Sequence, residues 1–271
     1  MKLDGRIALI TGAGSGLGRE IARTFAREGA KVAINDVNKE TAAAAVREVE
    51  AAGGAARAFI ADVSDSVEVA AMFEHLVDEW GTIDILVNNA GVAVMSDEVK
   101  ANFAANIQAM LSGTKPATSL GATRSMTDSH WRRTLSIHLD GTFYCTREAL
   151  KVMEPKGFGK IINMASVAGT TGLSGSPDYC AAKGGIIALT KSVAREVIGR
   201  GIYVNAIAPG FVDTPLLEVM DETMLRVIAM QSPIGRLGTP AEIAAVALYL
   251  ASEDSSFTVG QVISPNGGYY M

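Results

Sequence analysis

The stretch Thr11-Gly12-Ala13-Gly14-Ser15-Gly16-Leu17-Gly18 lies between a short apolar run, Arg6–Ile10, and a helical pattern, Arg19–Glu28. Glycines at a strand-to-helix turn let the backbone approach a pyrophosphate, whose negative charge is favoured at a helix N-terminus. The spacing is Gly-x3-Gly-x-Gly (Gly12, Gly16, Gly18) rather than the commoner Gly-x-Gly-x-x-Gly. Strand, glycine turn and helix together predict a nucleotide-binding unit.

A carboxylate follows the second predicted strand, Lys31–Asn35. This residue, Asp36, lies 24 positions after Gly12, close to the roughly 20 expected for an acid that bonds the adenosine ribose hydroxyls. A carboxylate there would repel a 2′-phosphate, and NADP sites tend to place an Arg nearby. Neither Ser15 nor Val37 is basic. The residues therefore predict NAD(H) as the cofactor.

A tyrosine and a lysine are spaced to share one helix face. Tyr179 and Lys183 are four residues apart, which places them one helical turn from each other. An ammonium beside a phenol favours the phenolate, so we expect the Tyr179 pKa to fall below its usual value of about 10. Such a phenol can exchange a proton with a substrate oxygen.

A serine ends another predicted strand, Lys160–Met164. Ser166 follows this apolar run, and ligands of open parallel sheets bind off the carboxyl ends of the strands. Ser166, Tyr179 and Lys183 are therefore expected at one crevice. The alternative is that Ser166 only bonds the backbone of its own loop.

Strands alternate with helical patterns along the whole sequence, which predicts a parallel sheet with helices on both faces. With 271 residues, we expect one α/β domain over 1–271. The seven predicted strands are Arg6–Ile10, Lys31–Asn35, Ala56–Ala61, Ile83–Asn88, Lys160–Met164, Tyr203–Ala208 and Gln261–Ser264.

Composition excludes several classes of function. The net charge of −5 does not indicate the basic surface that binding of nucleic acid needs. The sequence contains no run of 18 apolar residues, so no membrane span is predicted. Two cysteines, Cys145 and Cys180, give no disulfide framework and suit a reducing cytoplasm. No metal site is predicted, and the expected partner is a small-molecule substrate.

Together, these segments resemble the short-chain dehydrogenase/reductase family over essentially the whole chain. The matching motifs are Thr11-Gly-Ala-Gly-Ser-Gly-Leu-Gly18, Asp62-Val63, Asn88-Asn-Ala-Gly91, Ser166 with Tyr179-x3-Lys183, Asn205, and Pro209-Gly210 with Thr214. The resemblance implies a single-domain, Rossmann-type doubly wound fold with a mostly parallel seven-stranded sheet.

The resemblance also implies roles. Tyr179 would be the general acid/base, Ser166 would orient and polarise the substrate oxygen, and Lys183 would lower the Tyr pKa and hold the nicotinamide ribose. Asp62 and Val63 would face the adenine, and Val212 and Thr214 the carboxamide. The implied cofactor-binding set is Gly12, Ser15, Gly16, Leu17, Gly18, Asp36, Asp62, Val63, Asn89, Ala90, Gly91, Tyr179, Lys183, Pro209, Gly210, Val212 and Thr214.

One position departs from the family pattern. The segment His138-Leu139-Asp140-Gly141-Thr142-Phe143 has His138 where the family usually has an Asn linked to a water that connects the Lys to solvent. An imidazole also donates and accepts hydrogen bonds. His138 is thus a candidate member of the proton path, and the alternatives are a packing residue or a sign of weakened activity.

Two segments are candidates for shaping the substrate pocket. Residues 94–127 form a longer segment than the short loop that the family has at this place, which predicts an insertion. Ser96 or Asp97 could cap a helix in it. One apolar face of this helix would carry Val99, Phe103, Ile107 and Met110–Leu111. The insertion is either a lid or pocket wall, or a surface decoration or subunit contact. Residues 211–236 carry apolar and Met side chains at a spacing that fits a helix face packed against the core. The family resemblance implies instead that this segment closes over substrate and cofactor, and its apolar surface would then suit a hydrophobic substrate.

The predicted function is NAD(H)-dependent interconversion of a secondary alcohol and a ketone on a hydrophobic or cyclic substrate. One alternative is a 3-oxoacyl-carrier-protein reductase, suggested by the C-terminal Asn266–Met271, although such reductases usually prefer NADP(H). The other is a non-catalytic nucleotide-sensing or scaffold protein. By resemblance, we expect a homotetramer paired through Trp131–Lys151 and Pro177–Arg195.

Overall fold

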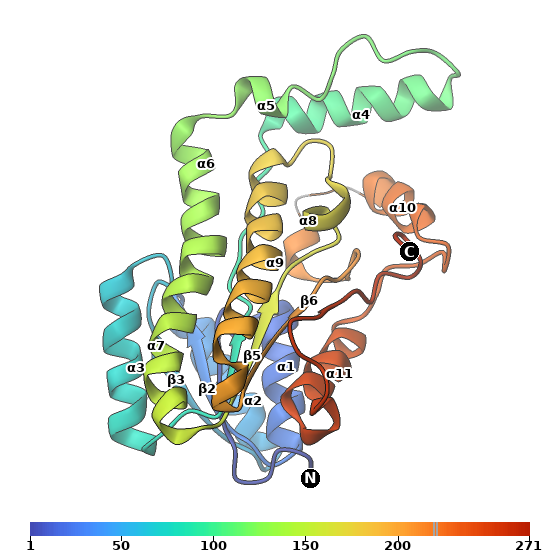
Figure 1. Ribbon diagram of the computed structural model, residues 1–271. Coiled ribbons are helices and arrows are strands. Elements are labelled where there is room, and N and C mark those ends of the chain that lie inside the picture. The colour runs from blue at the N-terminus through green and yellow to red at the C-terminus, as the bar shows by residue number, and fades with distance from the viewer. Residues whose placement is uncertain (219, 221) are drawn as a thin grey trace.

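A seven-stranded parallel sheet forms the centre of the molecule. The computed structural model describes residues 1–218, 220 and 222–271, and its strand order is β3-β2-β1-β4-β5-β6-β7 (Figure 1). The order reverses at β1, so the carboxyl ends of β1 and β4 flank the crevice where such sheets bind ligands. The strands are β1 (Ile7–Ile10), β2 (Lys31–Asp36), β3 (Ala55–Ile60), β4 (Ile85–Asn88), β5 (Gly159–Met164), β6 (Ile202–Ile207) and β7 (Val262–Ile263).

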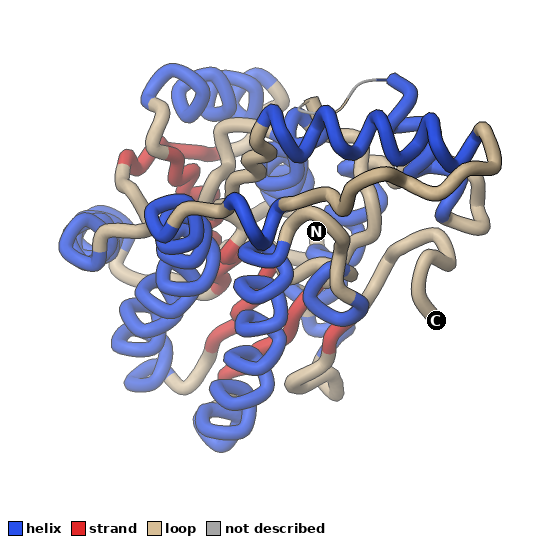
Figure 2. The backbone as a smooth tube through the Cα atoms, turned by 90° about the horizontal axis from the view of Figure 1, so that it is seen from above, coloured by secondary structure: helices blue, strands red, loops and turns tan. Residues whose placement is uncertain are grey.

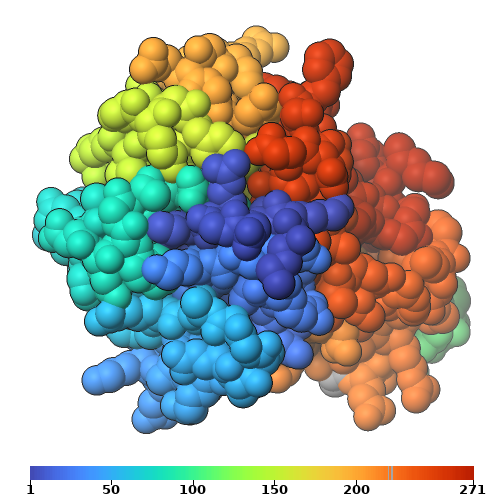
Figure 3. All heavy atoms as spheres, turned by 90° about the horizontal axis from the view of Figure 1, so that it is seen from below, coloured from blue at the N-terminus to red at the C-terminus, as the bar shows by residue number. Residues whose placement is uncertain are grey.

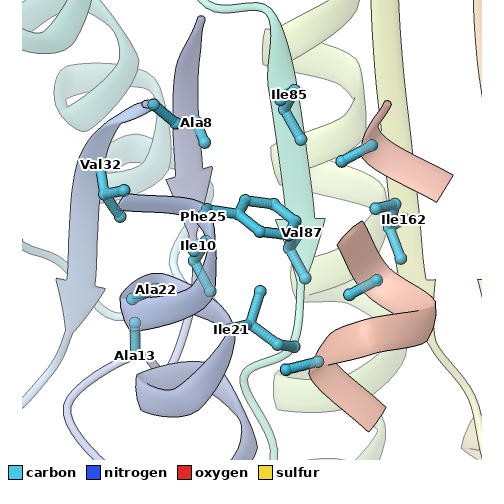
Figure 4. Close-up of a cluster of buried hydrophobic side chains, with 14 of the residues drawn as sticks. Ala8, Ile10, Ala13, Ile21, Ala22, Phe25, Val32, Ile85, Val87 and Ile162 are labelled. Atoms are coloured by element: carbon cyan, nitrogen blue, oxygen red, sulfur yellow. The ribbon is translucent and has the colours of Figure 1, made fainter. Parts of the chain in front are cut away.

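Helices cover both faces of this sheet. On one face lie α1 (Gly16–Arg27), α2 (Lys39–Ala51) and α11 (Pro240–Ala251); on the other lie α3 (Ser66–Trp80), α7 (Gly141–Lys156) and α9 (Pro177–Val197). Successive strand residues alternate between the two cores: Ile10 packs with α1 (Figure 4), whereas Leu9 packs with α3 and α7. Both strand faces are therefore buried, which explains the continuous apolar runs in the sequence.

The predicted fold class is confirmed. All seven strands form, each with ends within two residues of the predicted ones. The short elements are α5 (Ala122–Ser125), α6 (Asp128–Leu135), a π-helical turn (Ser136–Asp140), α8 (Ala168–Thr171), α10 (Glu222–Gln231) and three 3₁₀ turns (Ile198–Arg200, Pro215–Leu217 and Glu253–Ser255).

A chain of buried polar side chains crosses the core beneath the crevice. Asn88 Nδ2 of β4 donates to Thr146 Oγ1 of α7 (3.0 Å) and to Asn163 Oδ1 of β5 (2.8 Å). Asn163 Nδ2 in turn donates to Thr190 Oγ1 of α9 (2.9 Å). Asn88 and Asn163 are register partners in the sheet. These bonds join two helices through two neighbouring strands.

Residues 94–127, which we call the arm, form α4 (Asp97–Leu111), a return loop and α5, and α4 runs across the top of the molecule (Figures 1 and 2). The Ser96 side chain caps α4 by accepting from Val99 N (3.3 Å), as predicted. The expected apolar face packs only in part: Val99 and Ile107 are buried, whereas Met110 and Leu111 are 61% and 69% exposed. The C-terminal end of α4 therefore extends away from the body of the protein.

The N-terminal residues lie at the opposite end of the sheet from the crevice. Figure 3 shows them in dark blue beside the red-orange segment that follows α11, where Lys2 Nζ pairs with Asp254 Oδ2 (2.5 Å). Among the described residues, no helix combines the length and apolar character needed to cross a membrane.

Candidate active site

A cavity of about 440 Å³ opens along the carboxyl ends of the strands. The residues that the sequence predicts for the site line it, from Asp36 and Asp62 at one end, past Gly12 and the 89–91 turn, to Ser166, Tyr179 and Thr214. Gly18 is the exception among them, because it is buried beneath the cavity. A Cβ at Gly18 would lie 2.5 Å from Asn89 Nδ2, so the glycine lets α1 pack against that turn.

The glycine turn and the turn after β4 are joined by hydrogen bonds. Asn89 Nδ2 donates to the carbonyl oxygens of Thr11 (2.9 Å) and Gly12 (3.2 Å). Thr11 Oγ1 accepts from the backbone amides of Asn89 and Ala90, each at 3.0 Å. A Cβ on Gly12 would lie 2.8 Å from Ala90 Cα. The two turns thus form one rigid floor for a ligand.

This floor fits a dinucleotide. Ser15 at the N-cap of α1 is extended and its side chain makes no capping hydrogen bond, while Ser15, Gly16 and Leu17 line the cavity. The first amides of a helix lack intrahelical partners and attract anions. The uncapped end of α1 therefore suits a pyrophosphate. Thr214 lies close by, since a Cβ built on Gly16 would be 3.8 Å from Thr214 Cβ.

The two acids at the far end of the cavity are held in place by nearby donors. Asp36 Oδ2 accepts from Gly14 N (3.0 Å), and its Oδ1 accepts from Asn38 N (2.9 Å). Asp62 Oδ1 accepts from the amide and the hydroxyl of Ser64 (2.9 and 2.7 Å). Both carboxylates keep a fixed direction, as a ribose- or adenine-binding residue needs.

Ser166, Tyr179 and Lys183 meet at the other end, as predicted from their positions. Ser166 follows β5, and the other two lie in the first turns of α9, which begins at Pro177. Lys183 Nζ donates to Met164 O (2.6 Å) and lies 5.5 Å from the Tyr179 ring centroid. Ser166 Oγ also accepts a hydrogen bond from Ala168 N (3.2 Å). Ser166 therefore bonds the backbone of its own loop, as the alternative predicted, and also lies at the crevice.

The expected fall in the Tyr179 pKa is wrong. Burial raises the pKa of Tyr179 above its ordinary value, and the Ser166 hydroxyl, which favours the phenolate, offsets this only in part. Burial also lowers the pKa of Lys183 to about 7. Because Lys183 is then only partly charged near neutral pH, it stabilises the phenolate less than a full ammonium would.

His138 is buried in the π-helical turn between α6 and α7, with its ring edge-on to Tyr179 (centroids 5.3 Å apart). Its Nε2 lies 3.0 Å from Val92 N and 2.9 Å from Val92 O, and one ring nitrogen serves only one of these at a time. Its Nδ1 is buried with no hydrogen-bond partner among the described residues. Burial, and then the charge of Lys183, lower the pKa of His138 to about 3, so the imidazole is neutral.

Sequence reasoning missed several residues around the reacting end. Asp178, directly before Tyr179, is buried and accepts from Thr134 Oγ1 (2.6 Å), with His130 Nε2 3.2 Å away. Its position beside Tyr179 was the only available signal. Residues 92–93, 171–173 and Tyr269 also line the cavity, and only the fold brings these distant pieces together. Residues 94–95, at the start of the segment that the sequence offered as a possible pocket wall, line it too.

Comparisons with known proteins identify the family of the chain. Residues 6–225 match the family model described as short chain dehydrogenase. The chain is similar to 3-oxoacyl-[acyl-carrier-protein] reductases from Thermotoga maritima (36% identical over 268 residues, 99% of each chain) and Escherichia coli K12 (35% over 271 residues, 100% of each). It is also similar to a (2S)-[(R)-hydroxy(phenyl)methyl]succinyl-CoA dehydrogenase subunit from Thauera aromatica (35%; 99% of this chain, 98% of the relative). A solved short-chain type dehydrogenase/reductase from Mycobacterium marinum superposes with a TM-score of 0.87 at 30% identity, covering 99% of this chain and 96% of that one.

Proposed function

Since the chain belongs to the short-chain dehydrogenase family, we propose that it interconverts a secondary alcohol and a ketone with NAD(H) as the hydride carrier. The observation that best supports this proposal is that one cavity is lined by the glycine turn, Ser166, Tyr179 and Lys183 together. A dinucleotide held at the glycine turn would bring its reactive end beside the phenol. The bound cofactor supplies the hydride chemistry, while the protein supplies orientation and proton transfer.

In the proposed mechanism, the hydroxyls of Ser166 and Tyr179 hold the substrate oxygen. During ketone reduction the proton moves from Tyr179 Oη to that oxygen, and during alcohol oxidation it moves back. The raised pKa of Tyr179 favours the protonated phenol that reduction needs. Lys183, fixed by its bond to Met164 O, would hold the ribose and carry the charge that adjusts the phenol.

His138 is proposed as a positioning residue in the place of the family's Asn. Its contact with the Val92 backbone supports a role in fixing the cavity wall that follows the 89–91 turn. Its neutral state and its unpartnered Nδ1 support a second role, in holding a water near Lys183 for the proton path. A polar atom buried this deeply is costly unless a water or ligand meets it.

The choice of NAD over NADP rests on Asp36. Its carboxylate is directed by Gly14 N and Asn38 N, and Val37 beside it is 64% exposed and uncharged. A 2′-phosphate would meet this fixed negative charge, and neither residue next to Asp36 in the sequence, Asn35 or Val37, is a cation that could offset it. Apolar side chains from Met95, Leu173, Leu217 and Met220 line the substrate end of the cavity and support a hydrophobic substrate.

A second candidate is reduction of a 3-oxoacyl thioester. It is favoured by the names of three similar proteins, two reductases of acyl-carrier-protein thioesters and one dehydrogenase of a CoA thioester. An assay of acetoacetyl thioesters beside free ketones, each with NADH and NADPH, separates the two candidates. Preferential turnover of the thioesters would replace our first proposal.

The deciding experiment replaces Tyr179 by Phe. Turnover should fall by roughly 10² to 10⁴, the usual contribution of a positioned acid/base, while NADH binding, followed by fluorescence, should stay nearly unchanged. Unchanged turnover in the variant would refute the role of Tyr179. If the unaltered protein binds NADH but oxidises no alcohol and reduces no ketone or thioester, the non-catalytic alternative replaces the enzyme.

We further propose a single domain over residues 1–271, supported by strands from both halves of the chain in one sheet. A homotetramer is proposed from the family pattern, and Phe143 of α7, 45% exposed, supports a contact on the α7–α9 face. A sizing column tests the assembly. A cytoplasmic location is proposed from the two cysteines, which are both free.

A further inference from the structure

The arm packs against the loop that leads to Tyr179. Val99 of α4 is buried, and Leu120 of the return loop is half-buried. Both meet Gly175: a Cβ built there would lie 3.2 Å from Leu120 Cδ1 and 3.6 Å from Val99 Cγ1. Gly175 also has φ of 91°, a conformation that side-chain-bearing residues rarely adopt. Loop and arm are thus in direct contact at a glycine.

The return loop is held in place along α4. Asn102 Nδ2 donates to Leu120 O (3.2 Å), and Arg124 Nη2 pairs with Glu98 Oε1 (3.1 Å). Leu120 is therefore presented to Gly175 by bonds within the arm. An arm that lost this contact would leave the loop without its outer support.

The supported loop is itself anchored at the site. Cys180 Sγ accepts from Leu173 N (3.0 Å), which ties the loop to α9 beside Tyr179. Leu173 lines the cavity, and so does Met95 at the start of the arm, whereas no residue of helix α4 does. The arm therefore forms part of the cavity wall through Met95 and supports a second part of it through Gly175.

We propose that the arm is a specificity element, which positions Met95 and Leu173 so that the site prefers a bulky apolar group on the reacting carbon. This inference rests on the proposed function. The cofactor half of the site, from Gly12 to Asp62, has no part in it. The arm should accordingly affect the choice of ketone and leave the binding of nicotinamide cofactor unchanged.

The test replaces Leu120 by Ala, with Leu111→Ala as the matched control, because Leu111 lies at the exposed end of the same arm. For each protein, kcat/KM is measured with acetophenone and with acetone, and NADH affinity is measured by fluorescence. Leu120→Ala should lower the acetophenone-to-acetone ratio about ten-fold, which is the discrimination lost when an apolar pocket wall shifts by about the size of one methylene. The control ratio and all NADH affinities should match the unaltered protein.

A second variant and a second measurement keep the test decisive. Met95→Ala changes the wall directly and should lower the same ratio, and hydrogen exchange of residues 172–176 should become faster in Leu120→Ala alone. The inference is overturned if the acetophenone-to-acetone ratio is unchanged in both Leu120→Ala and Met95→Ala while hydrogen exchange of residues 172–176 is faster in Leu120→Ala. The proposed function is unaffected by that result. Absence of ketone turnover in the unaltered protein removes the proposed function and, with it, this inference.

Discussion

The fixed carboxylate of Asp36 makes a quantitative prediction about cofactor choice. Two backbone amides hold it, Gly14 N at 3.0 Å and Asn38 N at 2.9 Å, so it cannot turn away from a ligand. Two unit charges about 4 Å apart repel by about 1 kcal/mol in water and about 4 kcal/mol at the effective dielectric of a protein surface. A 2′-phosphate beside Asp36 should therefore weaken NADPH relative to NADH by between roughly five-fold and several hundred-fold.

Asp36→Asn removes the charge and keeps an oxygen that can accept from Gly14 N. The ratio of kcat/KM for NADH to that for NADPH, measured with one ketone, should fall by at least about five-fold, most of it through better use of NADPH. Glu40→Gln is the control, since Glu40 is an exposed acid in the first turn of α2 and should leave the ratio unchanged. Equal use of both cofactors by the unaltered protein, or no response to Asp36→Asn, would refute the reasoning.

Two further predictions concern the reacting end. Because the pKa of Tyr179 is raised, the phenolate needed for alcohol oxidation is scarce near neutral pH. The value of kcat/KM for oxidation should therefore rise, by at most about ten-fold per pH unit, between about pH 7 and 9. Ketone reduction uses the protonated phenol and should not rise over this range, in which Lys183 loses its charge. The reverse pattern in a pH series would contradict the raised pKa. His138→Asn should retain turnover, since an amide can serve both Val92 N and Val92 O, whereas His138→Ala should lose roughly ten- to a hundred-fold in kcat at unchanged NADH affinity. Full activity of the alanine variant would reduce His138 to a packing residue.

Much of the fold was predictable because parallel strands buried on both faces must be short apolar runs, and glycine turns mark where they end. The positions of Ser166, Tyr179 and Lys183 followed from strand end and helix spacing alone. Their meeting in the structure needs no information beyond the order of elements. The same holds for Asp36, which ends β2 at the edge of the crevice.

Other properties depend on surroundings that sequence spacing does not encode. The Tyr179 pKa was predicted with the wrong sign because spacing reveals the neighbouring ammonium but not the burial that opposes it. The exposure of Met110 and Leu111 was not foreseen either, since an apolar pattern does not specify whether a partner surface exists. The contact of the arm with Gly175 joins segments more than 50 residues apart and becomes visible only in the fold.

The hydrogen-bonded chain from Thr146 through Asn88 and Asn163 to Thr190 has a consequence for catalysis. A slip of β5 by one position would turn Asn163 to the opposite face and break the links on both sides. The alignment of β5 with β4 is thereby locked, and so is the span between Ser166, three residues beyond Asn163, and the turn that follows Asn88. The geometry of the proposed proton transfer therefore depends on buried threonines and asparagines that do not line the cavity.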